Sequence, residues 1–193
     1  MKSYNEASGE ATSIALDEER VASKSATSPN EYANRLRDAA VRLARKGFKV
    51  FPLVPNGKVP AFKDQDWKVT ASDDPDRVHR LWSEALSGDP LDFNIGIATG
   101  SGLFVLDIDN KDGKHGSATL AGLELEHGDL PPTLVVRTAS GGLHYYFRAP
   151  PDLWIPNSVG KLGPGLDVRG DGGYVVGPGS MVAGRIYEPE PRQ

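Results

Sequence analysis

Residues 103–109 read Leu103-Phe104-Val105-Leu106-Asp107-Ile108-Asp109, an apolar run that ends in two carboxylates one residue apart. A run this rich in large apolar side chains is typical of a strand buried on both faces, where an ionised group is normally excluded. Side chains at positions i and i+2 of a strand point to the same face, so Asp107 and Asp109 should project together. Such a pair repels unless a cation lies between its members, and oxygen ligands on a rigid strand suit Mg²⁺ or Mn²⁺. The pattern alone is also compatible with aspartates that only cap a strand end.

The residues around this run predict several short strands. A strand is expected at 94–99, and Gly100-Ser101-Gly102 should link it tightly to the aspartate strand, so that both lie in one sheet. Two later strands, at 133–138 and 143–148, form a predicted hairpin whose turn reads Ala139-Ser140-Gly141-Gly142. Further short strands are expected at 166–169, 174–176 and 185–187.

Helical spacing and capping signals predict three helices among these strands. The first begins at the capping box Ser28-Pro29-Asn30-Glu31 and ends at Gly47. The second begins at Asp73-Asp74-Pro75 and ends at Gly88, and the third follows the polar loop 110–116 and ends near Gly128. A strand at 48–53 and a turn-rich loop at 55–60, which presents Lys58, come between the first two helices. Mixed helices and strands predict the α+β class.

Length and composition limit the class of protein. With 193 residues the chain fits one domain with tails: a flexible leader at 1–28, a core at 29–187, and the start of a linker to C-terminal modules at 188–193. The net charge of −4 excludes a general polycation, although a local basic surface is still compatible with it. The absence of cysteine excludes disulfides, thiolate catalysis and cysteine-ligated metals. No apolar stretch approaches the roughly 20 residues of a membrane span, so we expect a cytoplasmic protein without a membrane partner.

Two further groups of polar residues accompany the aspartate pair. Ser140-Gly141-Gly142 precedes His144, and glycines let backbone N–H groups approach an anion. Asp167 lies in the strand expected at 166–169 and is followed by Arg169. A triphosphate with two divalent ions needs carboxylates for the metals, donors for the phosphates and a nearby cation. Each piece by itself also occurs in ordinary turns and strands.

In this order, the motifs resemble those of the primase-polymerase (prim-pol) branch of the archaeo-eukaryotic primase superfamily, as found in phage and plasmid replication proteins. The first family motif, two carboxylates around a hydrophobic residue, matches Asp107-Ile108-Asp109. The second, a small residue and glycines before a histidine, matches Ser140-Gly141-Gly142-Leu143-His144, and the third matches Leu166-Asp167. The likeness covers about residues 31–187.

This resemblance implies a fold and an activity. The fold would be a two-part α+β catalytic core with a sheet like that of RNA-recognition domains and a second small sheet. The activity would be template-directed nucleotidyl transfer from NTPs or dNTPs on single-stranded DNA, with primer synthesis and extension. A helicase module would follow the core in the full-length protein, and a phage-encoded protein would act in the host cytoplasm.

The resemblance also implies roles for individual residues. Two Mg²⁺ or Mn²⁺ ions would be held by Asp107, Asp109 and Asp167. The phosphates of the incoming nucleotide would be bound by Ser140, Gly141, Gly142 and His144. Further phosphate contacts are expected from Arg169 and Lys58.

Three other functions are compatible with parts of the sequence. A nucleotide-sugar glycosyltransferase also uses two aspartates around one residue to bind Mn²⁺, but it needs no third carboxylate. A non-catalytic nucleic-acid-binding module would need exposed aromatic side chains on its sheet, and Tyr145, Tyr146 and Phe147 form the only cluster. A metal-dependent nuclease would degrade DNA and ignore nucleotides.

Overall fold

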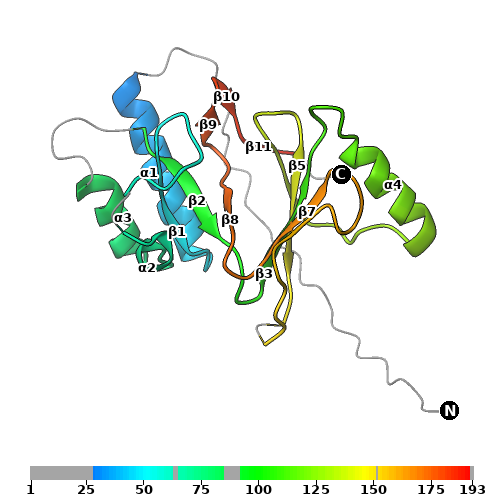
Figure 1. The fold of residues 1–193 in the computed structure, drawn as a ribbon. Coiled ribbons are helices and arrows are strands. Elements are labelled where there is room, and N and C mark those ends of the chain that lie inside the picture. The colour runs from blue at the N-terminus through cyan, green and yellow to red at the C-terminus, as the bar shows by residue number, and fades with distance from the viewer. Residues whose placement is uncertain (1–27, 63–64, 85–91, 151, 192–193) are drawn as a thin grey trace.

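Two antiparallel sheets divide the molecule into two lobes that lie side by side (Figure 1). The computed structural model describes residues 28–62, 65–84, 92–150 and 152–191. The expected leader, apart from Ser28, and the expected helix end at Gly88 therefore lie outside the described residues. Within them, the mixed α+β class matches the prediction.

The first lobe, which we call the small-sheet lobe, is built on three strands in the order β1-β2-β8. Its elements are α1 (Pro29–Arg45), β1 (Val50–Leu53), α2 (Trp67–Thr70), α3 (Pro75–Glu84), β2 (Asn94–Ala98) and β8 (Tyr174–Val176). Helix α1 starts where the capping box predicts, because the Glu31 amide donates to Ser28 Oγ at 3.2 Å. The core joins helix and sheet through fully buried side chains such as Leu36, Trp82 and Ile95.

The second lobe, the large-sheet lobe, contains a six-stranded antiparallel sheet in the order β11-β4-β5-β3-β7-β6. Its elements are β3 (Leu103–Ile108), α4 (Gly116–His127), β4 (Leu134–Arg137), β5 (Leu143–Arg148), β6 (Ser158–Val159), β7 (Leu166–Arg169) and β11 (Glu188–Pro189). A hairpin of β9 (Met181–Val182) and β10 (Arg185–Ile186) forms a separate two-stranded sheet.

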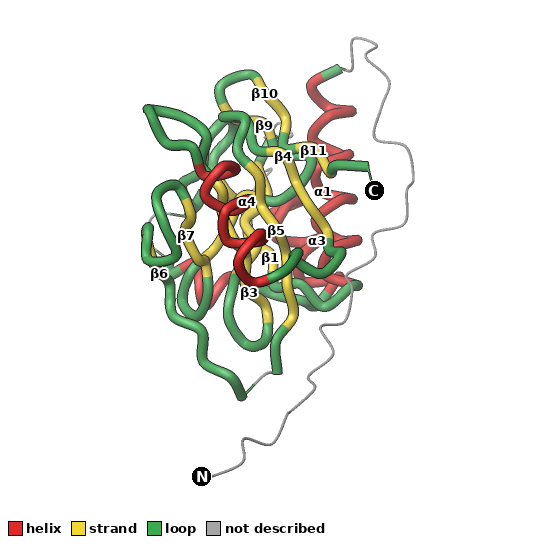
Figure 2. The backbone as a smooth tube through the Cα atoms, turned by 90° about the vertical axis from the view of Figure 1, so that its right-hand side faces the viewer, coloured by secondary structure: helices red, strands yellow, loops and turns green. Residues whose placement is uncertain are grey.

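The two faces of the large sheet are covered by different partners. Helix α4 lies over one face, and α1 and α3 lie on the opposite side (Figure 2). On the α4 side, Leu106 and Ile108 of β3 pack with Leu120 of the helix. On the other side, Val105 and Tyr146 belong to the core cluster of the small-sheet lobe. Strand β3 is thus sandwiched between apolar partners, as its sequence predicts.

The predicted pairing of the 94–99 strand with the aspartate strand is wrong. Strand β2 pairs with β1 and β8, and β3 pairs with β5 and β7, so both edges of each strand are already taken. The link between them is a tight turn in which Ser101 and Gly102 have φ of 51° and 89°. It joins the strands only through one bridge, between Gly100 and Leu103, before they diverge into different sheets.

The sequence does not predict several short elements, because they have too few residues to show a helical or strand period. These are α2, β6, β9 and β11. Glu188 and Pro189, at the expected start of the linker, pair with Arg137 and Val136 of β4. The Arg137 guanidinium also forms an ion pair with Glu190, with Nε and Oε1 at 2.5 Å. Among the described residues, no helix is long and apolar enough to cross a membrane.

Candidate active site

The strand register brings three of the predicted site residues into one row across the large sheet. Asp107 on β3 lies directly opposite His144 on β5 and directly opposite Asp167 on β7. Residues directly opposite each other in a sheet share a face, so all three side chains point the same way. Val105 and Tyr146 lie on this face as well, which is the face that packs on the small-sheet lobe.

Arg169 joins the two carboxylates of this row. It lies two residues after Asp167 on β7, so its side chain is on the same face. Its Nη2 lies 3.1 Å from Asp107 Oδ2 and 3.0 Å from Asp167 Oδ2, and its Nε lies 3.3 Å from the same Asp107 oxygen. The other oxygen of Asp167 accepts a hydrogen bond from the Gly160 amide at 3.0 Å. One guanidinium therefore holds two carboxylates that would otherwise repel.

Asp107 is an ionised group in a largely buried position. Burial alone would raise the pKa of its carboxyl group. The hydrogen bond and charge of His144, together with Arg169, outweigh that effect and lower the pKa to about 2. The contact between His144 Nε2 and Asp107 Oδ1 is 3.5 Å long.

His144 is enclosed by aromatic rings. Its side chain is 6% exposed, and its ring centroid lies 5.7 Å from that of Tyr187 and 6.3 Å from that of Tyr146. Within the described part of the chain, neither the buried His144 Nδ1 nor the buried Tyr146 hydroxyl has a hydrogen-bond partner. The histidine therefore presents one nitrogen to Asp107 and leaves the other in a buried aromatic environment.

Asp109 lies just beyond the end of β3 and has its own cation. Its Oδ2 lies 3.1 Å from Lys114 Nζ, and this pair is more exposed than the pair of Asp107 and Arg169. The Asp109 backbone is fixed by two neighbours, because its amide donates to Gly165 and its carbonyl accepts from Gly116, each at 2.9 Å. Asp109 is thus positioned next to the row, while its side chain is turned to the loop that follows the strand.

The predicted phosphate-binding turn is held together internally. The Gly141 amide donates to the Thr138 carbonyl at 3.0 Å, and the Gly142 amide donates to Thr138 Oγ1 at 3.0 Å. The same Thr138 hydroxyl lies 3.1 Å from Ser140 Oγ. Both glycine amides expected to face a phosphate therefore already have acceptors in this structure.

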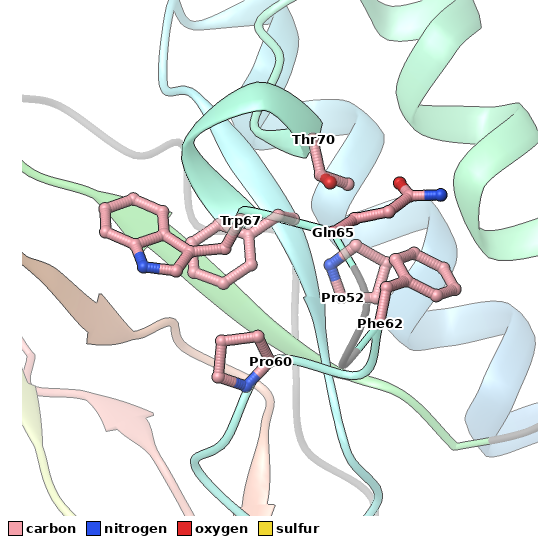
Figure 3. Close-up of a pocket in the computed structure, with 7 residues that line it drawn as sticks. Pro52, Pro60, Phe62, Gln65, Trp67 and Thr70 are labelled. Atoms are coloured by element: carbon pink, nitrogen blue, oxygen red, sulfur yellow. The ribbon is translucent and has the colours of Figure 1, made fainter.

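Lys58 lies on the other lobe, in the loop after β1. Its carbonyl accepts a hydrogen bond from the Tyr174 hydroxyl at 3.2 Å. Among the described residues, its ammonium group has no contact with any of the three aspartates. A small recess of the same lobe is walled by Phe62, Trp67 and neighbouring residues (Figure 3), with Trp67 stacked on Phe51 at a centroid distance of 5.0 Å. None of the predicted site residues lines it.

The comparison with protein families gives one result. A family model described as the N-terminal domain of bifunctional DNA primase/polymerase, Prim-Pol, matches residues 40–193. The chain belongs to the Prim-Pol family. The prim-pol domain is a nucleotidyltransferase of DNA replication, and its family implies a DNA template and nucleotide substrates. The comparison with curated proteins gives no match.

This result decides among the functions that the sequence left open. It favours the polymerase over the glycosyltransferase and the nuclease. The structure adds an argument against base stacking on the sheet, because Tyr146 and Phe147 are buried and Tyr145 is half-buried in the row of rings beside Phe104.

Polymerases of this kind typically use divalent metal ions, and the carboxylates of the prim-pol domain fit one. Asp107 and Asp167 face each other closely enough to share one guanidinium, and such paired carboxylate oxygens are ligands that Mg²⁺ and Mn²⁺ prefer. In the described ranges, however, no three His, Asp or Glu side chains stand together as a ready metal site. The carboxylates pair instead with Arg169 and Lys114.

The prim-pol domain therefore brings Asp107, Asp167, His144 and Arg169 together, with Asp109 beside them. Sequence reasoning missed Lys114, Thr138 and Tyr187, which contact Asp109, the glycine turn and His144. Lys114 could have been noticed as a cation five residues after Asp109. Nothing in the sequence places Tyr187 against His144, because that contact depends on how the two lobes meet.

Proposed function

We propose that the row of Asp107, Asp167 and His144, with Asp109 and Arg169, is the nucleotidyl-transfer site of this prim-pol domain. The observation that carries the proposal is the pairing of Asp107 with Asp167 across adjacent strands, with a cation between them. Two carboxylates on rigid, paired strands have little freedom to separate, so they form a preorganised place for positive charge.

In this proposal Asp107, Asp109 and Asp167 hold two Mg²⁺ or Mn²⁺ ions. When bound, these ions activate the primer 3′-hydroxyl and stabilise the charge on the triphosphate and the departing pyrophosphate. Arg169 supplies a positive charge for the triphosphate. His144 fixes the orientation of Asp107 through its Nε2, and its expected phosphate contact belongs to the proposal too.

The glycine turn and Lys58 complete the proposed nucleotide site. Because Gly141 and Gly142 already donate within the turn, the turn contributes mainly a rigid, close-packed edge and the Ser140 hydroxyl. Lys58, from the small-sheet lobe, would contact a phosphate from the opposite side. Arg185, whose guanidinium donates to the Ala139 carbonyl at 3.3 Å, supports the same turn.

The finer assignment follows the resemblance described above. We infer that the domain has the archaeo-eukaryotic primase core, with the large sheet as its RNA-recognition-like part and the small sheet as the second part. We also infer a protein of the phage or plasmid replication type, which makes and extends primers on single-stranded DNA from NTPs or dNTPs. A helicase module is the expected C-terminal partner within the same protein.

The test is extension of a labelled primer on a single-stranded template, with dNTPs or NTPs and with Mg²⁺ or Mn²⁺. Asp107→Asn and Asp167→Asn should each lower incorporation by roughly 1,000-fold, because several kcal/mol of transition-state stabilisation depends on the metals. The matched control is Asp112→Asn, in the exposed loop after β3, where φ is 55° and asparagine is well accommodated. It should extend at the wild-type rate. Undiminished synthesis by Asp107→Asn would overturn the assignment of the site.

A further inference from the structure

Each of the three proposed metal-binding carboxylates is neutralised by a side chain of the protein itself. Arg169 lies between Asp107 and Asp167, and Lys114 lies against Asp109. The two pairs differ in burial. Arg169 is 32% exposed and its two carboxylates are 15% and 8% exposed, whereas Lys114 is 44% exposed and its carboxylate is 19% exposed. Screening by water leaves the Lys114 pair weak, so Arg169 is the cation that dominates the site.

Arg169 and a divalent ion require the same oxygens. Both contacts of the Arg169 Nη2 use the Oδ2 atoms of Asp107 and Asp167, the atoms that face each other across the sheet. A guanidinium and a divalent ion close together would repel strongly in this poorly solvated position. The Arg169 side chain is 32% exposed, so it has an open path to solvent that the buried carboxylates do not have.

We propose that Arg169 is an exchangeable cation, which holds Asp107 and Asp167 together in the metal-free protein and leaves them when a divalent ion binds. The released guanidinium is then available to an anion, and the triphosphate that accompanies the metal is the anion at hand. Arg169 therefore lowers the affinity of the free protein for metal and couples metal binding to triphosphate binding. This inference rests on the proposed function, because it assumes that the carboxylates take the metal.

The first test measures Mn²⁺ binding to the intact chain by electron paramagnetic resonance of the free ion, without nucleotide. Arg169→Gln should bind Mn²⁺ roughly 5- to 150-fold more tightly than wild type, which is the usual range for coupling between two ligands. Arg37→Gln is the matched control, since it removes an arginine that pairs with Asp38 on the surface of α1. It should bind Mn²⁺ as wild type does. Equal or weaker binding by Arg169→Gln would overturn the proposal.

The second test uses thermal unfolding and requires no activity. In EDTA, Arg169→Gln should melt roughly 5 °C below wild type, because two facing carboxylates lose their shared cation. Saturating Mn²⁺ should raise the melting temperature of Arg169→Gln more than that of wild type. A larger Mn²⁺ shift in wild type would contradict the exchange. Failure of Arg169→Gln to fold even with Mn²⁺ would also contradict the exchange, since the metal is expected to replace the lost cation.

The third test asks, without any metal, whether Arg169 binds an anion when it has lost a carboxylate partner. In EDTA, inorganic tripolyphosphate should bind more tightly to Asp107→Asn than to wild type, because Arg169 has lost one of its two partners. The double variant Asp107→Asn/Arg169→Gln should lose this gain. If the double variant keeps the gain, the effect comes only from the removed negative charge, and Arg169 is not the anion contact.

These outcomes separate failure of this inference from failure of the proposed function. If Asp107→Asn leaves Mn²⁺ binding unchanged in both the wild-type and the Arg169→Gln background, the metal site itself is misassigned. If Asp107→Asn abolishes Mn²⁺ binding but Arg169→Gln does not tighten it, the site is correct and the exchange is wrong.

Discussion

At the scale of single residues, Asp107 is the most constrained group of the site. It contacts His144 and Arg169 and lies directly opposite Asp167. The sequence presents two neighbouring carboxylates that should repel without metal. In the structure each has a protein cation instead. Removing the Asp107 carboxylate takes away one of the two ion pairs of Arg169 and leaves the pair with Asp167, so we expect it to lower the stability of the fold.

Gly142 lies where the backbone of the glycine turn packs closely against β3. A Cβ atom at this position would lie 2.2 Å from the Ile108 carbonyl oxygen of β3. We therefore expect Gly142→Ala to lower the free energy of unfolding by about 2 kcal/mol, as overpacking typically does. The measurement is urea denaturation.

The control for this prediction is a glycine with space around it. Gly122 lies on the exposed side of α4, and a Cβ atom added there would have no neighbour within 4 Å. Gly122→Ala should raise the free energy of unfolding by roughly 0.5–1 kcal/mol, because alanine favours the helix. If both variants change stability in the same direction, the steric explanation for Gly142 is wrong.

At the scale of elements, Tyr32 connects α1 to the segment after β8. Its hydroxyl donates to the Gly179 carbonyl at 3.0 Å. Burial, with a further contribution from Asp92 and an opposing one from Arg35, raises the pKa of Tyr32 to about 12. The folded protein therefore keeps the proton more firmly than the unfolded chain, in which tyrosine has a pKa near 10. The resulting stability is complete below pH 10 and is lost as the pH rises through 12.

Tyr32→Phe tests this pH dependence. At pH 8 the variant should be less stable than wild type by about 1 kcal/mol, the usual net value of one hydrogen bond. Between pH 10 and 12 the difference should shrink. The wild type then loses the stability that depends on the protonated Tyr32 hydroxyl, whereas the variant has no such hydroxyl at any pH. Guanidinium unfolding at several pH values measures the difference. A difference that stays constant or widens across this range would contradict the assignment.

The elements that the sequence predicts well are those with a clear local signal. The capping box at Ser28 and the apolar run of β3 each specify one element by nearby residues alone. The predicted pairing of β2 with β3 is wrong because sheet membership depends on which edges other strands occupy. Four elements of two to four residues, such as β6, carry no detectable period.

In the candidate site, too, the sequence predicts some features and not others. The resemblance of the three motifs to those of the family implies that Asp107, His144 and Asp167 come together, and the structure places them in one row. The ion pair between Arg169 and Asp107 is not predictable from spacing, because the two residues lie 62 positions apart along the chain. The internal hydrogen bonds of the glycine turn depend on the Thr138 rotamer, which the sequence does not reveal.

At the scale of the whole molecule, the net charge of −4 opposes binding to DNA. Phosphate neutralisation supplies most nonspecific affinity for nucleic acid, so an acidic domain should depend on a few local contacts. We expect binding to a single-stranded oligonucleotide to weaken with salt. The slope of log affinity against log salt should be no steeper than about −3, equivalent to roughly four phosphates. Fluorescence anisotropy measures it, and a slope near −6 would reveal an extended basic surface and refute this expectation.

The two ends of the six-stranded sheet have a consequence for the molecule in a crowded solution. Both end strands, β6 and β11, are only two residues long, and β11 contains Pro189, which has no backbone N–H. An exposed strand edge is a template on which a strand of another chain can add, and short strands and proline are the usual protection against it. The two end strands of the sheet that carries the proposed polymerase site therefore protect it against β-sheet aggregation.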